Sequence, residues 1–306
     1  MANYIQNISS LLAGVVETHD DLLVYGENID NGSRIVGICR GLAKDKNYKL
    51  VNVGNYENTH IGLGLGFLLR GGKSILVAKQ LDFMLLGLDQ LVNTLNSLRE
   101  MPNQPEGSFT ILTVVCDQGF QGPQSSFNSA ADLASLCRIP IFCLNNKHEA
   151  NTIMKTEIGK VGFRLMLLSQ KAFGCEQDDF EAPIPVEKNA GFKYSSGDDG
   201  VIFCSNFSLL HGLSIKSEFE NKGYNYSTYS LNYSNKQEVE KLIRIEAKKN
   251  NAIFIDDSKS LHCYSDSLAF IFKSINSSAD VKVLKRPLDI SFGVGNDLFQ
   301  FDKPSI

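Results

Sequence analysis

The chain has 306 residues, a hydrophobic fraction of 43% and a formal net charge of -4, which is typical of a globular protein with two domains of ordinary size. The mild negative charge and the lack of Lys/Arg runs argue against nucleic acid as a partner. No apolar stretch is long enough to span a bilayer, and the first ten residues lack a signal-peptide pattern, so we expect a cytoplasmic protein.

The first half of the chain alternates apolar strand-like runs with helical patterns. Helical spacing is found at 4–21, 58–72, 84–100 and 131–139, and residues 33–46 are expected to form a helix or an irregular segment. Strands are expected at 22–29, 48–54, 73–83, 108–119, 140–146 and 165–173. This alternation predicts parallel βαβ units in a doubly wound sheet.

A second alternation follows a polar segment. Residues 176–199 are rich in charged residues and contain prolines and glycines, which is typical of a linker or crossover. Strands are then expected at 200–210, 224–232, 251–257 and 281–287, and helices at 211–223, 236–250 and 261–276. We therefore predict an α/β protein with two doubly wound domains, 1–175 and 200–306, joined by 176–199.

Most candidate motifs for chemistry are weak. The seven cysteines form no CxxC pair, and the five histidines have no metal-ligand spacing, so neither a zinc site nor a disulfide framework is indicated. The "GLGLGF" run at 62–67 is not a dinucleotide-binding GxGxxG at a strand end, and close helix packing explains it better. No P-loop and no nucleophile elbow occur.

A single acid, Glu57, stands between an apolar strand and the glycine-spaced helix, in "VNVGNYENTHIGLGLG". An acid at this position is commonly a helix cap or a solvated residue. A buried carboxylate would instead need a proton or a partner, and that form suits proton exchange with a ligand. His60, three residues later, is the histidine nearest to it in the sequence. The residues alone leave both interpretations open.

Five segments in the correct order resemble one family. They are "VYGENIDNGSRIVGICRGL", "NVGNYENTHIGLGLGFLLRG", "LDFMLLGLDQLVN", "LMLLSQKAF" and "VLKRPLDISFG". Together they resemble the β subunit of the thiamine-diphosphate-dependent 2-oxoacid dehydrogenases, which is related to the C-terminal half of transketolase. The resemblance covers nearly the whole chain. It implies a pyrimidine-binding domain followed by a transketolase C-terminal domain.

The resemblance also implies roles for particular residues. Glu57 matches the family's catalytic glutamate, which hydrogen-bonds the cofactor's aminopyrimidine ring and promotes its imino tautomer. The aromatic residue that stacks on this ring falls on Gln80 here, and Phe83 matches the second aromatic residue. A loop histidine of the relatives is absent. Ser125 and Ser126 are its nearest replacements, and with His60 they are candidates for the substrate pocket.

The resemblance implies a second chain. The Gly-Asp-Gly…Asn motif that binds the diphosphate through Mg²⁺ is absent, so no metal ligand is expected in this chain. In the family a separate α subunit supplies that half, usually as an α2β2 heterotetramer. Mg²⁺ would then have its ligands in the α-type partner.

Three functions are consistent with these residues. The leading one is a β-type subunit of an enzyme that cleaves or forms a carbon-carbon bond next to a carbonyl, in a 2-oxoacid or a ketose. The runner-up is the C-terminal subunit of a split transketolase, which "NVGNYEN" favours. The third is a non-catalytic structural partner of an α subunit, because the stacking aromatic residue and the loop histidine are absent.

Overall fold

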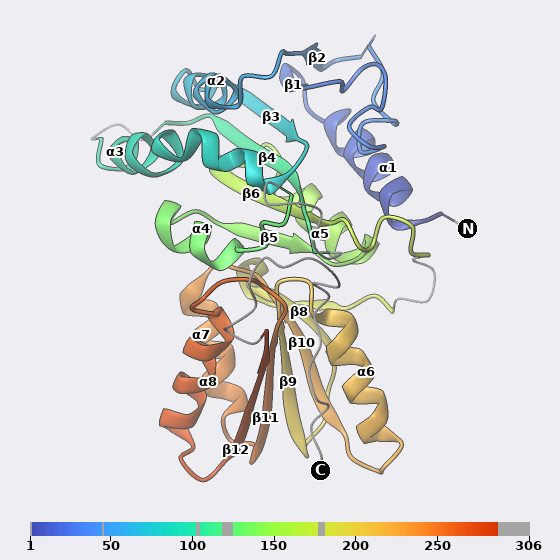
Figure 1. Cartoon of the computed structure of the whole chain (residues 1–306), viewed down its shortest axis with the longest axis vertical. Helices are drawn as coiled ribbons and strands as arrows, with labels where there is room; N and C mark the ends of the chain where they lie inside the picture. Colours follow the sequence, from blue (N-terminus) through green and yellow to red (C-terminus); the bar gives the residue numbers. More distant parts are fainter. Residues whose placement is uncertain (1, 45, 102–104, 118–124, 177–180, 287–306) are drawn as a thin grey trace. The chain divides into compact units, whose positions relative to one another are not determined.

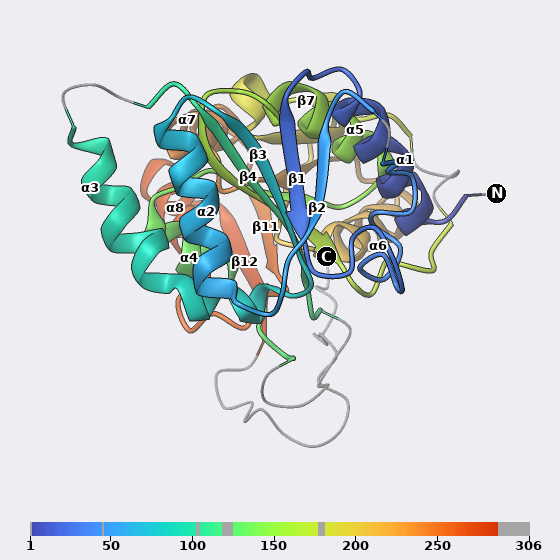
Figure 2. The ribbon, with the colours of Figure 1, turned by 90° about the horizontal axis from the view of Figure 1, so that it is seen from above.

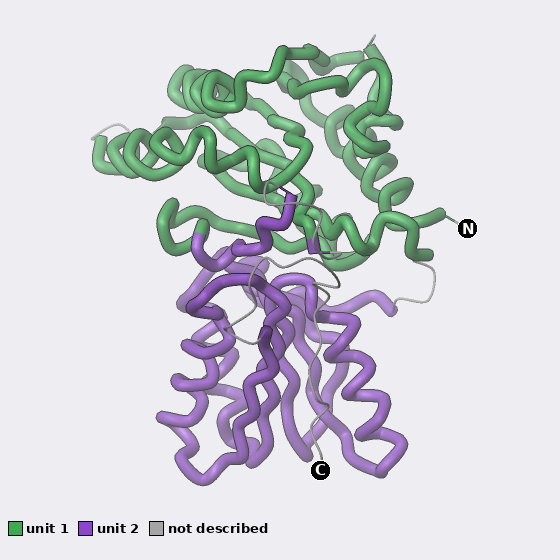
Figure 3. The backbone as a smooth tube through the Cα atoms, viewed as in Figure 1, with its two compact units in different colours: residues 1–116, 133–180 green, residues 117–132, 181–306 purple. Residues whose placement is uncertain are grey.

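The computed structural model describes residues 2–44, 46–101, 105–117, 125–176 and 181–286, and its chain divides into two compact units. Unit 1 comprises residues 1–116 and 133–180, and unit 2 comprises residues 117–132 and 181–306 (Figure 3). The expected division at 175 and 199 was linear along the chain. The compact units instead interleave, because the segment 117–132 groups with the later residues.

Unit 1 contains a parallel sheet of six strands in the order β2-β1-β3-β4-β6-β5. The strands are β1 (Leu22–Gly26), β2 (Lys49–Asn52), β3 (Lys73–Ala78), β4 (Ser108–Val115), β5 (Ile141–Leu144) and β6 (Gly162–Ser169). The helices are α1 (Tyr4–Val16), α2 (Glu57–Leu69), α3 (Leu95–Arg99), α4 (Ala130–Cys137) and α5 (Lys147–Glu157). The sheet lies between α2 and α3 on one face and α1 and α5 on the other (Figures 1 and 2).

Two segments of unit 1 are less regular than their patterns predict. Residues 33–44 form successive turns, in which Arg34, Ile35 and Val36 have positive φ angles. The expected helix 84–100 begins with the 3₁₀ helix η1 (Leu81–Gly87) and contains the π-helical η2 (Gln90–Thr94) before α3. The spacing of apolar residues in the sequence does not distinguish a tighter 3₁₀ helix or a wider π helix from an α-helix.

The glycine-rich run lies in α2 and serves close packing, as expected. A Cβ on Gly64 would lie 2.2–2.5 Å from ring carbons of Phe109 on β4, so only glycine lets the helix approach the sheet this closely. Gly66, in contrast, would meet nothing within 4 Å.

Unit 2 contains a second six-stranded sheet, in the order β12-β11-β9-β10-β8-β7. The strands are β7 (Ile184–Pro185), β8 (Gly191–Ser195), β9 (Gly200–Ser205), β10 (Tyr226–Leu231), β11 (Asn251–Asp256) and β12 (Asp280–Lys285). The helices are the 3₁₀ helix η3 (Glu187–Asn189), α6 (Leu209–Glu220), α7 (Lys236–Glu246) and α8 (Tyr264–Ile275). The segment 176–199 is therefore more than a linker, because β8 pairs antiparallel with β10 and with β7.

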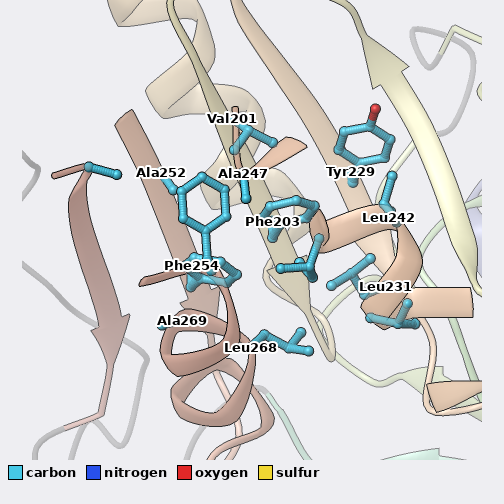
Figure 4. Close-up of a cluster of buried hydrophobic side chains, with 14 of the residues drawn as sticks. Val201, Phe203, Tyr229, Leu231, Leu242, Ala247, Ala252, Phe254, Leu268 and Ala269 are labelled. Atoms are coloured by element: carbon cyan, nitrogen blue, oxygen red, sulfur yellow. The ribbon is translucent and has the colours of Figure 1, made fainter. Parts of the chain in front are cut away.

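The core of unit 2 lies on both faces of this sheet. One cluster packs under α7 and α8, where Phe203 stacks against Tyr229 and Phe254 with ring centroids 5.4 and 5.1 Å apart (Figure 4). A smaller cluster lies under α6 and includes Ile215 and Phe219. Both units are thus α/β layers, which confirms the predicted fold class.

Candidate active site

The carboxyl ends of β1, β2 and β3 bring charged side chains together. In the strand order β2-β1-β3, the chain leaves β1 toward one edge of the sheet and leaves β3 toward the other. Ligands of open α/β sheets bind outside the carboxyl ends at such a topological switch point. Here Glu27 follows β1, Lys79 follows β3, and Glu57 begins the helix α2 that comes after β2.

These three residues line one small and narrow pocket, which encloses about 10 Å³. The remaining lining residues are His60, Leu76, Val77, Ala78, Phe83 and Met84. Apolar walls with a few convergent polar groups are typical of sites for small organic ligands. The structure therefore brings together Glu57, His60 and Phe83, three of the candidates from the sequence.

Glu27 was not among those candidates, and the preceding glycine explains its position. A Cβ on Gly26 would lie 2.3 Å from the carbonyl oxygen of Val77, so β1 ends in close contact with β3. This contact places Glu27 beside the residues that follow β3. The sequence signal was hidden, because the expected strand 22–29 runs past Glu27, whereas β1 ends at Gly26.

Glu57 acts on the second carboxyl group of the pocket. Burial raises the pKa of Glu27, and the negative charge of Glu57 raises it further, while His60 and Lys79 oppose the shift. A carboxylate with a raised pKa next to another carboxylate is able to hold a proton that the pair can exchange. The pocket is thus suited to moving a proton to or from a bound ligand.

Hydrogen bonds of neighbouring residues fix the start of α2, where Glu57 lies. Glu57 is half-buried at the first turn of α2, where the helix dipole favours a negative charge. One turn later, His60 is 5% exposed and its Nε2 donates to the carbonyl oxygen of Gly54 at 2.7 Å. The Tyr25 hydroxyl donates to the His60 carbonyl oxygen at 2.6 Å. His60 therefore fixes the loop before α2 to the helix, in addition to lining the pocket.

Gln80 and Phe83 differ in their placement. The Gln80 side chain is buried, and its Nε2 donates to the Cys116 Sγ at 3.3 Å. Gln80 does not line the pocket that holds Glu57. Phe83, in η1, is half-buried and does line it. The aromatic surface of the pocket therefore comes from Phe83.

Ser125 and Ser126 lie in the segment 117–132, which groups with unit 2, whereas the pocket belongs to unit 1. Ser126 is fully buried and Ser125 is partly buried. Residues 118–124 of the same loop, and the end of the expected C-terminal motif beyond Arg286, lie outside the described residues. A substrate role for the two serines remains a prediction.

The part of the chain that the structure describes contains no group of three or more His, Cys, Asp or Glu side chains arranged to hold a metal ion. Among the same residues, no helix combines the length and the apolar character needed to cross a membrane.

Comparisons with known proteins identify the fold. No family model and no curated protein matches the sequence. Among solved structures, a chain described as "Split gene transketolase, inactive beta4 tetramer" superposes with a TM-score of 0.68 at 13% identity, over 93% of this chain and 89% of that one. The transketolase of Campylobacter jejuni subsp. jejuni NCTC 11168 superposes with a TM-score of 0.67 at 11% identity.

The chain has a transketolase-like fold. It spans 43% of the Campylobacter jejuni transketolase while 97% of its own length is covered, so it is similar to one part of that longer chain. The split-gene chain is of comparable length. At these identities the likeness establishes the fold, and the chemistry has to be argued from the site.

Proposed function

We propose that the chain is the pyrimidine-binding subunit of a two-chain, thiamine-diphosphate-dependent enzyme that forms or cleaves a carbon-carbon bond next to a carbonyl. The observation that carries this proposal is the position of Glu57 at a switch-point pocket, beside a second carboxyl group and an aromatic side chain. The transketolase-like fold supports it, since thiamine diphosphate is the cofactor that the resembling family uses.

The pocket residues fit one half of this cofactor. The ring nitrogen of an aminopyrimidine accepts a hydrogen bond and takes up a proton in the imino tautomer, so the ring needs a carboxyl group that exchanges a proton with this nitrogen and an apolar surface along its face. Glu57 offers the first, and Phe83 with Val77 and Met84 offers the second. Bound thiamine diphosphate would supply an electron sink for the carbanion that arises next to the substrate carbonyl.

The side chains of this chain would bind, orient and exchange a proton. Glu57 would hold the ring nitrogen, with its charge stabilised at the start of α2. Glu27, whose pKa is raised by burial and by Glu57, would hold a proton near it. The apolar wall would exclude water and strengthen the hydrogen bond of Glu57. His60 would keep the loop before α2 in position.

A partner chain would complete the site. We propose an α-type subunit that supplies the diphosphate-binding residues and the Mg²⁺ ligands, in an α2β2 assembly. The helices beside the pocket expose apolar side chains, among them Tyr56 (70% exposed), Leu63 on α2, and Leu85 and Leu86 on η1. Exposed apolar groups of this kind are typical of protein–protein contact surfaces.

Two substrate classes are consistent with the site. One is a 2-oxoacid, as in the dehydrogenases whose β subunit the sequence resembles. The other is a ketose, as in a split transketolase, and the solved split-gene chain of similar length favours it. A non-catalytic partner role is the third possibility. The pairing of Glu57 with Glu27 in one pocket argues against it, since a structural subunit has no need of two adjacent carboxyl groups there.

The test is cofactor binding followed by turnover. Binding of thiamine diphosphate with Mg²⁺ is measured by calorimetry on the chain alone and on the chain co-purified with a partner that carries Gly-Asp-Gly…Asn. We expect binding only in the pair. A panel of 2-oxoacids and ketose phosphates then identifies the substrate.

Variants at two glutamates separate the enzyme from the structural partner. Glu57→Gln is expected to lower turnover by at least about 100-fold while the assembly stays intact, because the carboxylate exchanges a proton in the reaction. Glu100→Gln, an exposed acid beyond α3, is the matched control and should be neutral. Equal turnover of Glu57→Gln and Glu100→Gln would contradict the catalytic assignment.

A further inference from the structure

A second cavity lies at the amino ends of the unit 1 strands, whereas Glu57 lies at their carboxyl ends. It encloses about 410 Å³ and is lined by residues that precede or begin the amino ends of β4, β5 and β6, among them Pro105, Pro140 and Phe163. The C-terminal part of α2 and the helix α3 close it with Leu68, Leu95 and Leu98. Its volume falls in the range of small-molecule sites.

The cavity collects positive charge in a chain whose net charge is negative. Four cationic side chains line it and one anionic side chain does; these are Arg99, Arg138, Lys160, Arg164 and Glu157. The chain as a whole carries a formal charge of -4. The lining therefore has a formal excess of three positive charges beside apolar walls.

Three of the four cations, Arg164, Lys160 and Arg99, form hydrogen bonds or ion pairs within the protein. The buried guanidinium of Arg164 donates to the Ser108 and Thr110 hydroxyl oxygens at 2.9 and 3.3 Å and to backbone carbonyls, and burial lowers its pKa to about 10. The Lys160 Nζ pairs with Glu157 at 2.9 Å. Arg164 and Lys160 thus have structural roles.

Arg99 ends α3, and its Nη1 donates to the Asn96 Oδ1 at 2.8 Å and to the Cys137 carbonyl oxygen at 2.9 Å. The next residue, Arg138, is exposed with a φ of 52°, in the left-handed region that few non-glycine residues adopt. No hydrogen bond or ion pair joins the Arg138 side chain to any part of the chain that the structure describes. Burial lowers the pKa of Arg99, and the charge of Arg138 lowers it further.

The ends of α3 and α4 account for part of this arrangement. A cation near a helix C-terminus is favourable, so each arginine stabilises one helix end. That role does not require two guanidinium groups close enough to repel each other, nor an apolar cavity beside them. An anion between the two groups would relieve the repulsion, and a carboxylate or phosphate matches the donor geometry of arginine.

We propose that this cavity binds a small organic anion, with its carboxylate or phosphate held by Arg99 and Arg138 and its apolar body against Leu95, Leu98 and Phe163. The proposal is independent of the function proposed above, because the two pockets lie at opposite ends of the strands and share no residue. An occupant of this cavity would act as an effector or a second ligand.

Four simple probes test the chemistry by calorimetry on the full chain. Octanoate and octyl phosphate carry both an anion and an apolar body, acetate lacks the body, and octanol lacks the charge. We expect saturable one-site binding of octanoate or octyl phosphate, and the tighter of the two identifies the head group. Acetate and octanol should bind at least about tenfold more weakly, since each lacks one half of the interaction.

Variants locate the site. Arg138→Gln keeps the length of the side chain and should weaken binding of the tighter probe by about tenfold or more. Val161→Trp, at an exposed position of the rim, should block the cavity. Arg244→Gln, on α7 in unit 2, removes the same charge elsewhere and should change nothing. Absence of saturable binding, equal binding of octanol, or unchanged binding in Arg138→Gln would overturn the proposal.

Discussion

A buried aspartate in unit 2 should make the stability of the protein depend on pH. Asp257 directly follows β11 and is 5% exposed. Its Oδ1 accepts hydrogen bonds from the Asn206 Nδ2 and the Phe207 backbone N–H, both at 2.9 Å. Burial, together with the negative charges of Asp117 and Asp256, nevertheless raises its pKa to about 7. The folded protein thus disfavours the ionised form of this carboxyl group.

The size and sign of the effect follow from that pKa. The ordinary pKa of an aspartate is 3.8 and folding raises it to about 7, which corresponds to about 4 kcal/mol because a tenfold change in the proton equilibrium is worth about 1.4 kcal/mol. Because the folded pKa is the higher one, the stabilising contribution is complete below pH 4 and is lost as the pH rises through 7. The carboxyl group therefore costs the folded state up to about 4 kcal/mol at pH 8 relative to pH 4.

The substitution Asp257→Asn removes the ionisation and keeps an oxygen that can accept the two hydrogen bonds. We expect the variant to match the wild type near pH 4 and to be more stable by a few kcal/mol at pH 8, as measured by urea unfolding at both pH values. Asp280→Asn, at the exposed first position of β12, is the control and should show no such pH dependence. A stability difference for Asp257→Asn that is the same at pH 4 and pH 8 would refute the reasoning.

Two further pairs of variants test the packing of each unit by urea unfolding. Gly64→Ala should lower the free energy of unfolding by about 2 kcal/mol, because its Cβ would overlap the ring of Phe109, whereas Gly66→Ala in the same helix should be neutral or stabilising by up to about 1 kcal/mol. An equal effect at both glycines would contradict the packing argument. Glu246→Ala should cost about 3 kcal/mol, because it leaves a buried lysine without its counter-ion at 2.5 Å, whereas Glu240→Ala, from an exposed helix pair, should cost less than about 0.5 kcal/mol.

The fold class could be predicted because strand and helix periods alternate clearly along both halves of the chain. The irregular windings could not, since the apolar residues of 84–100 satisfy a helical pattern whether the backbone is α, 3₁₀ or π. Residues 184–195 were also interpreted wrongly as part of a linker. Edge strands that are short and partly exposed carry little apolar signal, and Pro185 lies in one of them.

The candidate site was predictable only in part. Glu57 and Phe83 were found through their place in a motif, and both line the pocket. Glu27 was missed because it falls within the expected strand 22–29, and its proximity to Glu57 depends on the strand order β2-β1-β3. Gln80 was matched to the residue that stacks on the cofactor ring. Its side chain donates a hydrogen bond to Cys116, and a contact of Gln80 with the cofactor stays a prediction.

Both units have a topological switch point, but its carboxyl side is occupied differently in each unit. In unit 2 the order β11-β9-β10 creates a second switch point, between β9 and β11, and Asn206 and Asp257 lie at its carboxyl edge. Asn128 of the same chain lies against these two residues, at the carboxyl ends of β9 and β11. The side chain of Asn128 accepts a hydrogen bond from the Asn206 Nδ2 at 2.7 Å and donates one to the Asp257 carbonyl at 3.1 Å. The Lys259 backbone N–H donates to the Asn128 carbonyl at 2.6 Å.

Asn128 thus occupies the position that an external ligand takes in other open α/β sheets, and it lies in the segment that the division into units assigns to unit 2. Its polar contacts with unit 2 are buried, which explains why this segment groups with unit 2 although it directly follows β4 of unit 1. Within the described residues, the switch point of unit 1 retains a pocket, lined by Glu27 and Glu57. The proposed chemistry therefore belongs to unit 1, while the second switch point binds a loop of its own chain.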